Sequence, residues 1–405
     1  MNRAILDFFF DAWIIDSPII GIGNLKKKIK YSMRTNLNLR LLFVNEMMKL
    51  IKRYVIIFSL FFCLYIIIVY KNRLFPSFIF GKFYLLSTDK NFTVKLKQSQ
   101  YYYQSKTNPN IILYDVKQDN PWKFQCPFTK YKESDISDVR ICIYDPQHDE
   151  HISGQLNDYG KWEPVVVRSF LRLLRTIPNT HVIDVGSNIG LYTLLATQLD
   201  RQVLSIEPLY DSLIRLHKSI QLNNVEHLVT VIANAIGNKH EKLQLNIVDK
   251  NIGGSYLSIL DDMKVNAVQE REIVPKILAD VDTIVLDDLV DIYPSYFKRA
   301  ILKLDIEGFE AYAFQNATIL FNRTEIPAVY MEFGKLIELK YSSGMMEAIK
   351  HMIDFLRIRN YEPYEVNDLN HLLFDNWESW PWDIVFKRCD LCRCPGLDKA
   401  VGLTE

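Results

Sequence analysis

HVIDVGSNIGLY, residues 181–192, combines a short apolar run with a tight turn that contains two glycines. Val182–Val185 has the length and apolarity of a buried strand, and the apolar residues Leu191–Leu199 predict a helix directly after the turn. Gly186 and Gly190 leave the backbone open to close approach by a ligand, and the first N–H groups of a helix are free to donate. The stretch therefore predicts a strand–turn–helix unit that cradles a nucleotide-like ligand.

The spacing within this turn discriminates between two kinds of cofactor. The glycines form G-x-x-x-G, and the acid Asp184 comes just before the first of them. Dinucleotide-binding folds use G-x-G-x-x-G instead. The spacing favours S-adenosylmethionine over NAD, while a strand–turn–helix unit without any ligand remains an alternative.

Strands and helices continue to alternate after the turn. The pattern predicts strands at 203–206, 229–233, 301–304 and 328–331, an amphipathic helix at 211–222, and a hairpin at 242–260. Glu207 closes the first of these strands, where its carboxylate is placed to accept both ribose hydroxyls. Asn234 and Ala235 close the second and are expected on the adenine side. Such alternation is typical of a doubly wound, mostly parallel sheet with helices on both faces.

Acidic residues follow two later strands. Asp305 and Glu307 come after 301–304 at alternate positions, and Glu332 comes after 328–331. Side chains two apart on a strand share a face, and the carboxyl ends of parallel strands meet at one edge of the sheet. The three acids are therefore expected to face one cleft.

Outside this core the sequence predicts further elements. They are a strand at 139–144, a helix at 162–177, a helix at 345–356, and strands at 361–366 and 383–386. Trp377, Trp380 and Trp382 are interpreted as packing residues in preference to a platform for sugars.

The N-terminal part predicts a membrane anchor. Residues 54–70, YVIIFSLFFCLYIIIVY, are uncharged and bounded by basic residues, close to the lower limit of about 17 residues for a span. The excess of basic residues before the segment places residues 1–53 in the cytosol. Residues 71–110 are expected to form a stem, and 111–405 a lumenal domain in the endoplasmic reticulum or Golgi. A start at Met47 or Met48 would make residues 1–46 a gene-model extension.

Three sequons, at Asn91, Asn316 and Asn322, agree with a lumenal and glycosylated domain. Cys389, Cys392 and Cys394 form a tight cluster without a second metal-binding pair, which is a poor zinc pattern. Disulfides fit better in an oxidising compartment, with Cys126 and Cys142 available as partners.

The overall composition excludes one class of partner. Apolar residues make up 49% of the 405 residues, enough for a large core. Lysine plus arginine and aspartate plus glutamate both number 48, so the chain lacks the positive excess expected of a nucleic-acid-binding protein.

Five motifs together resemble one family. They are DVGSNIG at 184–190, IEP at 206–208, NAIG at 234–237, LDDL at 286–289 and LKLDIEGFE at 302–310. This combination is similar to the FkbM family of S-adenosylmethionine-dependent methyltransferases, over roughly residues 162–388. The resemblance implies a class I, Rossmann-like, seven-stranded sheet with an antiparallel last hairpin, and methylation of a hydroxyl oxygen.

The resemblance also implies roles for individual residues. Asp184, Gly186, Asn188 and Gly190 would hold the methionine part of the cofactor, Glu207 the ribose, and Asn234 and Ala235 the adenine. Asp305 and Glu307 would lie beside the sulfonium, one accepting the hydroxyl proton and the other orienting the cofactor, with Glu332 as a further candidate. No metal is assigned, although clustered acids would suit magnesium.

The acceptor is expected to be a hydroxyl of a glycan, a lipid or a small molecule, because an anchored lumenal enzyme meets passing glycoproteins and glycolipids. Two alternatives stay open: a catalytically silent lumenal binding protein, and an NAD-dependent oxidoreductase.

Overall fold

The structure is a computed structural model. It describes residues 100–131, 136–248, 250–258, 278–292, 297–366 and 370–391. The chain divides into two compact units, 1–87 and 88–405, and every described residue lies in the second. The expected tail, the anchor at 54–70, the sequon at Asn91 and most of the stem lie outside the described residues.

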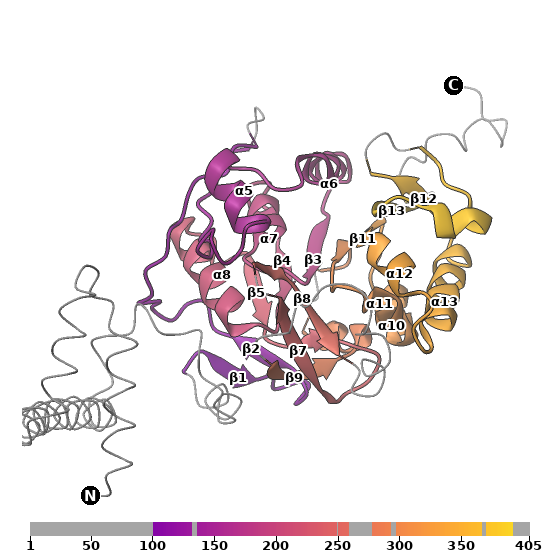
Figure 1. The fold of residues 1–405 in the computed structure, drawn as a ribbon, viewed down its shortest axis with the longest axis horizontal. Helices are drawn as coiled ribbons and strands as arrows, with labels where there is room; N and C mark the ends of the chain where they lie inside the picture. The colour runs from indigo at the N-terminus through magenta and orange to yellow at the C-terminus, as the bar shows by residue number, and fades with distance from the viewer. Residues whose placement is uncertain are drawn as a thin grey trace, which may run out of the picture. The chain divides into compact units, whose positions relative to one another are not determined.

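The main sheet has nine strands in the order β1-β2-β5-β4-β3-β10-β11-β13-β12 (Figure 1). Their bounds are β1 Tyr102–Gln104, β2 Ile112–Tyr114, β3 His181–Val185, β4 Val203–Ile206, β5 Val229–Ile232, β10 Ala300–Leu304, β11 Ala328–Glu332, β12 Tyr361–Glu365 and β13 Asp383–Arg388. The five strands from β5 to β11 are mutually parallel, and β13 runs antiparallel to both of its neighbours. The predicted mixed α/β fold and its antiparallel last hairpin are therefore present.

The expected seven-stranded sheet is too small. β1 and β2 form an antiparallel hairpin that pairs with β5 and extends the sheet at that edge. Each of these strands has only three residues, too short to show a periodic pattern. The sheet thus already includes Tyr102, before the domain boundary placed at residue 111.

Helices cover both faces of the sheet. They are α5 Ile152–Tyr159, α6 Pro164–Thr176, α7 Leu191–Thr197, α8 Tyr210–Leu222, α10 Glu310–Ala313, α11 Thr318–Arg323, α12 Gly334–Leu339 and α13 Met345–Arg357, with 3₁₀ turns at Leu286–Asp291, Phe314–Asn316 and Phe374–Ser379. Successive residues of β3 belong to different cores: Val182 packs with α6, α7 and α8, whereas Ile183 packs with α10 to α13. Both faces are buried, as a parallel sheet requires, which explains why most residues of β3, β4 and β10 are apolar.

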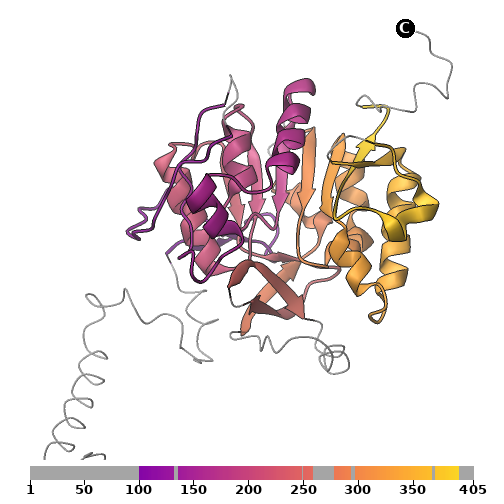
Figure 2. The same ribbon diagram turned by 45° about the horizontal axis from the view of Figure 1, so that its top comes forward.

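A second, four-stranded sheet has the order β6-β9-β7-β8. Its strands are β6 Ala235–Ile236, β7 Lys242–Val248, β8 Asn251–Ser258 and β9 Leu278–Ile284. The predicted hairpin at 242–260 is the β7–β8 pair, which projects from the main sheet in both views (Figures 1 and 2). A Cβ built on Gly253 of β8 would lie 2.7 Å from Nδ2 of Asn188, so this hairpin lies against the glycine turn.

The predicted strand at 139–144 is wrong. This segment forms an isolated bridge, between Arg140 and Phe128, and three backbone hydrogen bonds with residues 125–129, but it is not part of either sheet. The backbone N–H of Cys142 donates to Oγ of Ser219 on α8 instead of to a neighbouring strand. Its alternating apolar residues are buried because the segment crosses α8, and a disulfide joins Cys142 to Cys126.

Among the helices that the structure describes, none is long and apolar enough to cross a membrane. The sequon asparagines Asn316, in the 3₁₀ turn before α11, and Asn322, within α11, are both exposed.

Candidate active site

The glycine turn is packed tightly against the end of β10. Gly186 has φ of 77°, and a Cβ there would lie 1.8 Å from the carbonyl oxygen of Asp305. Gly190, with φ of 95°, is pressed against the side chain of Leu216 in the same way. No side chain fits at either position, so the backbone of the turn and the acid after β10 come close together.

A cleft opens beside this turn at the carboxyl ends of the parallel strands, and we call it the main cleft. It encloses about 560 Å³ of space that no atom fills, including its mouth. Predicted site residues that line it are Gly186, Asn188, Glu207, Asn234, Ala235, Asp305 and Glu307. Residues of β7 and β8, among them Leu245 and Gly253, complete its wall. The structure therefore brings most of the predicted ligand-binding residues to one place.

Glu207 is fixed at the floor of the main cleft. Its Oε2 accepts the N–H of Asn188 at 2.8 Å, and its Oε1 accepts the N–H of Leu209 at 2.7 Å. Only 7% of the residue is exposed, and this burial raises the pKa of its carboxyl group to about 7. Each oxygen keeps a lone pair, so a carboxylate held in this direction suits a pair of ligand hydroxyls.

Asn234 occupies its predicted place but its amide is already in use. Its Oδ1 accepts the N–H of Ile112 at 2.7 Å, while its Nδ2 donates to the carbonyls of Asn110 and Asp282. The side chain thus joins the edge of β2 to β9. Ala235, in β6, leaves room beside it in the same wall.

Asp184, in β3 before the turn, and Gly190, at the end of the turn, do not line the main cleft. Asp184 is 1% exposed, and its Oδ2 accepts the hydroxyl of Thr193 at 2.6 Å. Its burial raises the pKa of the carboxyl group. In this structure Asp184 bonds to Thr193 of α7 and Gly190 lies against Leu216 of α8. Their predicted contact with the methionine part stays a prediction.

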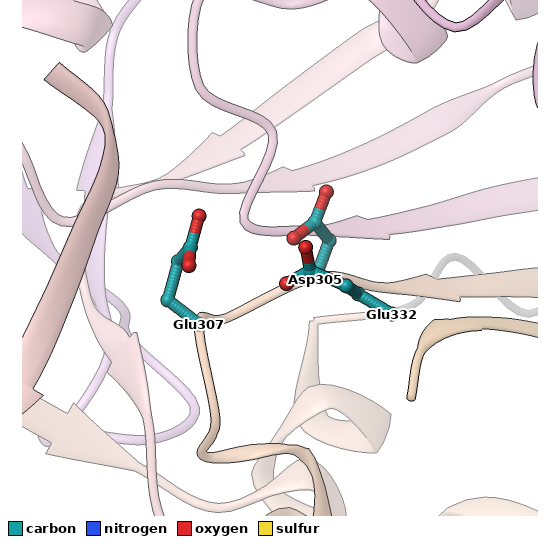
Figure 3. A group of neighbouring side chains, drawn as sticks. All are labelled: Asp305, Glu307 and Glu332. Atoms are coloured by element: carbon teal, nitrogen blue, oxygen red, sulfur yellow. The ribbon is translucent and has the colours of Figure 1, made fainter. Parts of the chain in front are cut away.

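The three predicted acids form a compact group (Figure 3). One oxygen of each of Asp305, Glu307 and Glu332 lies within 4.8 Å of the others. Burial, and then the charges of Glu332 and Asp305, raise the pKa of Glu307 to about 9. Burial, and then Asp305, raise that of Glu332 to about 7. At neutral pH the group is therefore partly protonated. A cationic ligand beside it would favour the ionised carboxylates.

A buried lysine completes this group, and sequence reasoning missed it. Lys303 is 5% exposed, and its Nζ lies 2.7 Å from Oδ2 of Asp305 and 4.4 Å from the ring centre of Tyr192. The hydroxyl of Tyr192 donates to Oε2 of Glu163 at 2.6 Å. Burial alone would lower the pKa of Lys303, but the neighbouring carboxylates, Asp305 foremost, raise it. The signal in the sequence is a single lysine inside an otherwise apolar strand.

A second cleft lies on the other side of Asp305. It has about 260 Å³ of space that no atom fills, including its open mouth, and is lined by Glu163, Val166, Lys303, Leu304, Asp305, Tyr330, Met331, Glu332, Val366, Asp383 and Ile384. Asp305 lines both clefts, Glu307 only the main one, and Glu332 only the second. The acids thus separate two neighbouring spaces that two reactants could occupy.

Three carboxylates at this spacing would also suit a hard cation such as magnesium. The ammonium of Lys303 already neutralises part of the group, and nothing else in the described residues points to an ion. We assign no metal.

The LDDL motif has a structural role in this fold. Oδ1 of Asp287 accepts the N–H of Leu320 in α11 at 2.8 Å, and Oδ1 of Asp288 accepts the amide of Asn108 at 2.9 Å. These contacts tie the 3₁₀ turn at Leu286–Asp291 to its neighbours, away from both clefts.

The sheet, the glycine turn and the acids at its carboxyl edge define a methyltransferase-like α/β domain. Residues 184–363 match the family described as the methyltransferase FkbM domain. The resemblance seen in the motifs is thereby confirmed over these residues.

Among solved structures, methyltransferase FkbM from Methylobacillus flagellatus KT is similar in part, with 17% identity and a TM-score of 0.30. The similar region covers 51% of this chain and 44% of that one, so the chain spans less than half the length of this relative. No curated protein matches the chain.

Proposed function

We propose that this protein is an S-adenosylmethionine-dependent O-methyltransferase that acts on a hydroxyl group. The observation that carries the proposal is that Glu207 and Asp305 line the same cleft as Gly186 of the glycine turn. Glu207 supports the ribose position because its two oxygens are aimed by backbone N–H groups. The residues present therefore fit this cofactor.

When bound, S-adenosylmethionine supplies a methyl group on a cationic sulfur. The carboxylates of Asp305 and Glu307 line the cleft that would receive that cation, and opposite charges at short range favour each other. Lys303 holds Asp305 by its Oδ2, which fixes the side chain that separates the two clefts. Holding the cofactor and the acceptor in reactive geometry can supply up to about 7 to 11 kcal/mol of the barrier.

Glu332 suits the role of general base. A hydroxyl is a weak nucleophile at neutral pH, and a base whose pKa lies near the working pH accelerates its attack by about 10²- to 10⁴-fold. Glu332 lines the second cleft, and the pKa of its carboxyl group is about 7. Glu332 would take up the proton that the acceptor hydroxyl loses on methylation, and the cofactor, its S–CH₃ bond broken, would leave as the neutral thioether S-adenosylhomocysteine.

We also propose that the domain works in the lumen of the secretory pathway, held there by the segment at 54–70. The Cys126–Cys142 disulfide supports an oxidising compartment. Protease added to sealed microsomes should spare the domain until detergent is added, and Asn91→Gln should remove a glycosidase-sensitive glycan. Digestion of the domain without detergent would contradict the lumenal orientation and place the domain in the cytosol.

The function is tested by methyl transfer from labelled S-adenosylmethionine to a panel of glycans, lipids and small alcohols. Wild-type protein should label at least one hydroxylated acceptor. Glu332→Gln should keep cofactor affinity and lose about 10²-fold or more of the turnover. Full turnover in Glu332→Gln would move the base to Asp305 or Glu307, and binding of the cofactor without labelling of any acceptor would favour a silent binding protein.

A further inference from the structure

The second cleft carries more acidic side chains than its known partners require. Glu163, Asp305, Glu332 and Asp383 line it, against the single ammonium of Lys303. The carboxylate of Asp383 has no hydrogen-bond or ion-pair partner among the described residues. Carboxylates accept hydrogen bonds and do not donate them when ionised, so the lining suits a ligand that offers several donors.

An exposed tryptophan adjoins this cleft. Trp382 is 48% exposed, precedes Asp383, and donates its Nε1–H to Oε1 of Glu332 at 2.6 Å. A Cβ built on Gly334 would lie 2.2 and 2.3 Å from Cε3 and Cδ2 of the indole. These distances place the ring directly against the Gly334 backbone, while about half of the residue stays exposed.

The tryptophan is also held rigidly. Its carbonyl oxygen accepts the N–H groups of Phe333 and Gly334 at 2.7 and 3.0 Å. With its carbonyl oxygen and its indole nitrogen both bonded, the exposed part of the ring has a fixed orientation. A fixed aromatic face binds an apolar surface with little loss of side-chain entropy. The sequence interpretation of Trp382 as a packing residue therefore accounts only for the part of the ring that lies against Gly334.

We infer that the second cleft and Trp382 form the acceptor site, and that its acceptor is a neutral sugar. The apolar C–H face of a sugar ring would pack on the exposed part of the Trp382 ring, while its hydroxyls would donate to Asp383 and the neighbouring carboxylates. One hydroxyl would then reach Asp305, the residue that the main cleft and the second cleft share. The inference rests on the proposed function for the direction from which the methyl group arrives.

The charge of the site argues for a neutral sugar over an acidic one. Uronic acids, sulfated sugars and phosphorylated sugars would bring negative charge beside several carboxylates, and like charges at short range repel. Lys303 does not offset this, because its ammonium is already bound to Asp305.

Binding is tested apart from catalysis, by saturation-transfer NMR of the full chain with methyl glycosides of neutral hexoses and with their uronic acid counterparts. The neutral glycosides should show transfer to their C–H face protons. Trp382→Ala should lower the affinity for the neutral glycosides about tenfold, because it removes the apolar area of the ring. Trp382→Phe should keep most of the glycoside affinity, since it retains an aromatic ring. It loses the bond to Glu332 and part of the apolar area of the indole.

Trp122 provides a matched control. It is 37% exposed and belongs to neither cleft, so Trp122→Ala should leave glycoside binding unchanged. The inference is overturned if no neutral glycoside binds, if uronic acids bind as well as neutral sugars, or if Trp382→Ala binds like wild type in a folded protein. Any of these results, together with methyl transfer to a non-sugar alcohol, would leave the proposed function intact. Glycoside binding without S-adenosylmethionine binding would overturn the proposed function alone.

Discussion

The ammonium of Lys303 lies 2.7 Å from Oδ2 of Asp305, two residues further along the same chain. This bond joins Lys303, near the end of strand β10, to the residue that lines both clefts. Lys303 is buried among acids, so its charge cannot be removed without leaving buried carboxylates uncompensated.

Lys303→Met should therefore destabilise the fold by about 3 to 5 kcal/mol, the usual result of removing one partner of a buried ion pair. Urea denaturation measures the change. Lys242→Met is the matched control, because Lys242 pairs with Asp282 at 2.6 Å but is 54% exposed, and exposed pairs contribute about 0 to 1 kcal/mol. Equal losses in the two variants would contradict a structural role for the buried pair.

Stability should fall as the pH rises from about 5 to 8. The folded protein raises the pKa of Glu207 and Glu332 to about 7 and that of Glu310 to about 8, mainly by burial. Their stabilising contribution is complete below the ordinary pKa of about 4.5 and is lost as the pH rises through the folded values, because the folded state then binds more protons than the unfolded state.

Thermal unfolding at pH 5, 6, 7 and 8 measures this dependence. Burial lowers the pKa of His217, which acts in the opposite direction, but the acids outnumber it. Glu310→Gln should flatten the curve, since the neutral amide no longer titrates. A melting temperature that climbs steadily from pH 5 to pH 8 would show that these acids are not held as the structure has them.

Binding of S-adenosylmethionine should release protons at pH 8. Glu307 lines the main cleft with a pKa of about 9, so it is mostly protonated before the cation arrives. A neighbouring positive charge favours the ionised carboxyl group and lowers its pKa. We expect release of up to about one proton, with affinity that rises with pH.

Calorimetry in two buffers of different ionisation enthalpy counts these protons. S-adenosylhomocysteine, which lacks the sulfonium charge, should release fewer, and Glu307→Gln should remove most of the difference between the two ligands. Equal proton counts for both ligands in wild-type protein would place the sulfonium away from Glu307.

Gly186→Ala should disrupt the site through the fold. A Cβ at this position would lie 1.8 Å from the Asp305 carbonyl, and φ of 77° is unfavourable for alanine, so we expect a loss of about 3 kcal/mol or more. Gly237→Ala is the control, since the nearest atoms to its Cβ are 3.4 Å away, and it should change stability by about 1 kcal/mol at most. Similar stabilities of the two variants would mean that the turn does not pack on Asp305 in this way.

Much of the fold could be predicted from the sequence. The strand at 203–206 and the helices near 211–222 and 345–356 form as predicted, because long apolar or amphipathic patterns have one way to be buried. The segment at 139–144 shows the limit of such patterns. Alternation reports which side chains are buried, but not whether the backbone finds a partner strand.

The site was predictable where motifs mark it and not where partners are distant in sequence. Glu207 and Asp305 lie at the expected edge of the sheet because both directly follow parallel strands. The pairing of Trp382 with Glu332 could not be predicted, because fifty positions separate the two residues and only the antiparallel register of β11 and β13 brings them together.

The central claim is that the main cleft binds S-adenosylmethionine with Glu207 at the ribose. Titration calorimetry of the full chain with S-adenosylmethionine and with NAD tests it most directly, in wild type and in Glu207→Ala. We expect binding of S-adenosylmethionine and not of NAD, and a loss of about 1.5 to 3 kcal/mol of binding free energy in a folded Glu207→Ala. Tighter binding of NAD, or unchanged affinity for S-adenosylmethionine in Glu207→Ala, would contradict the account.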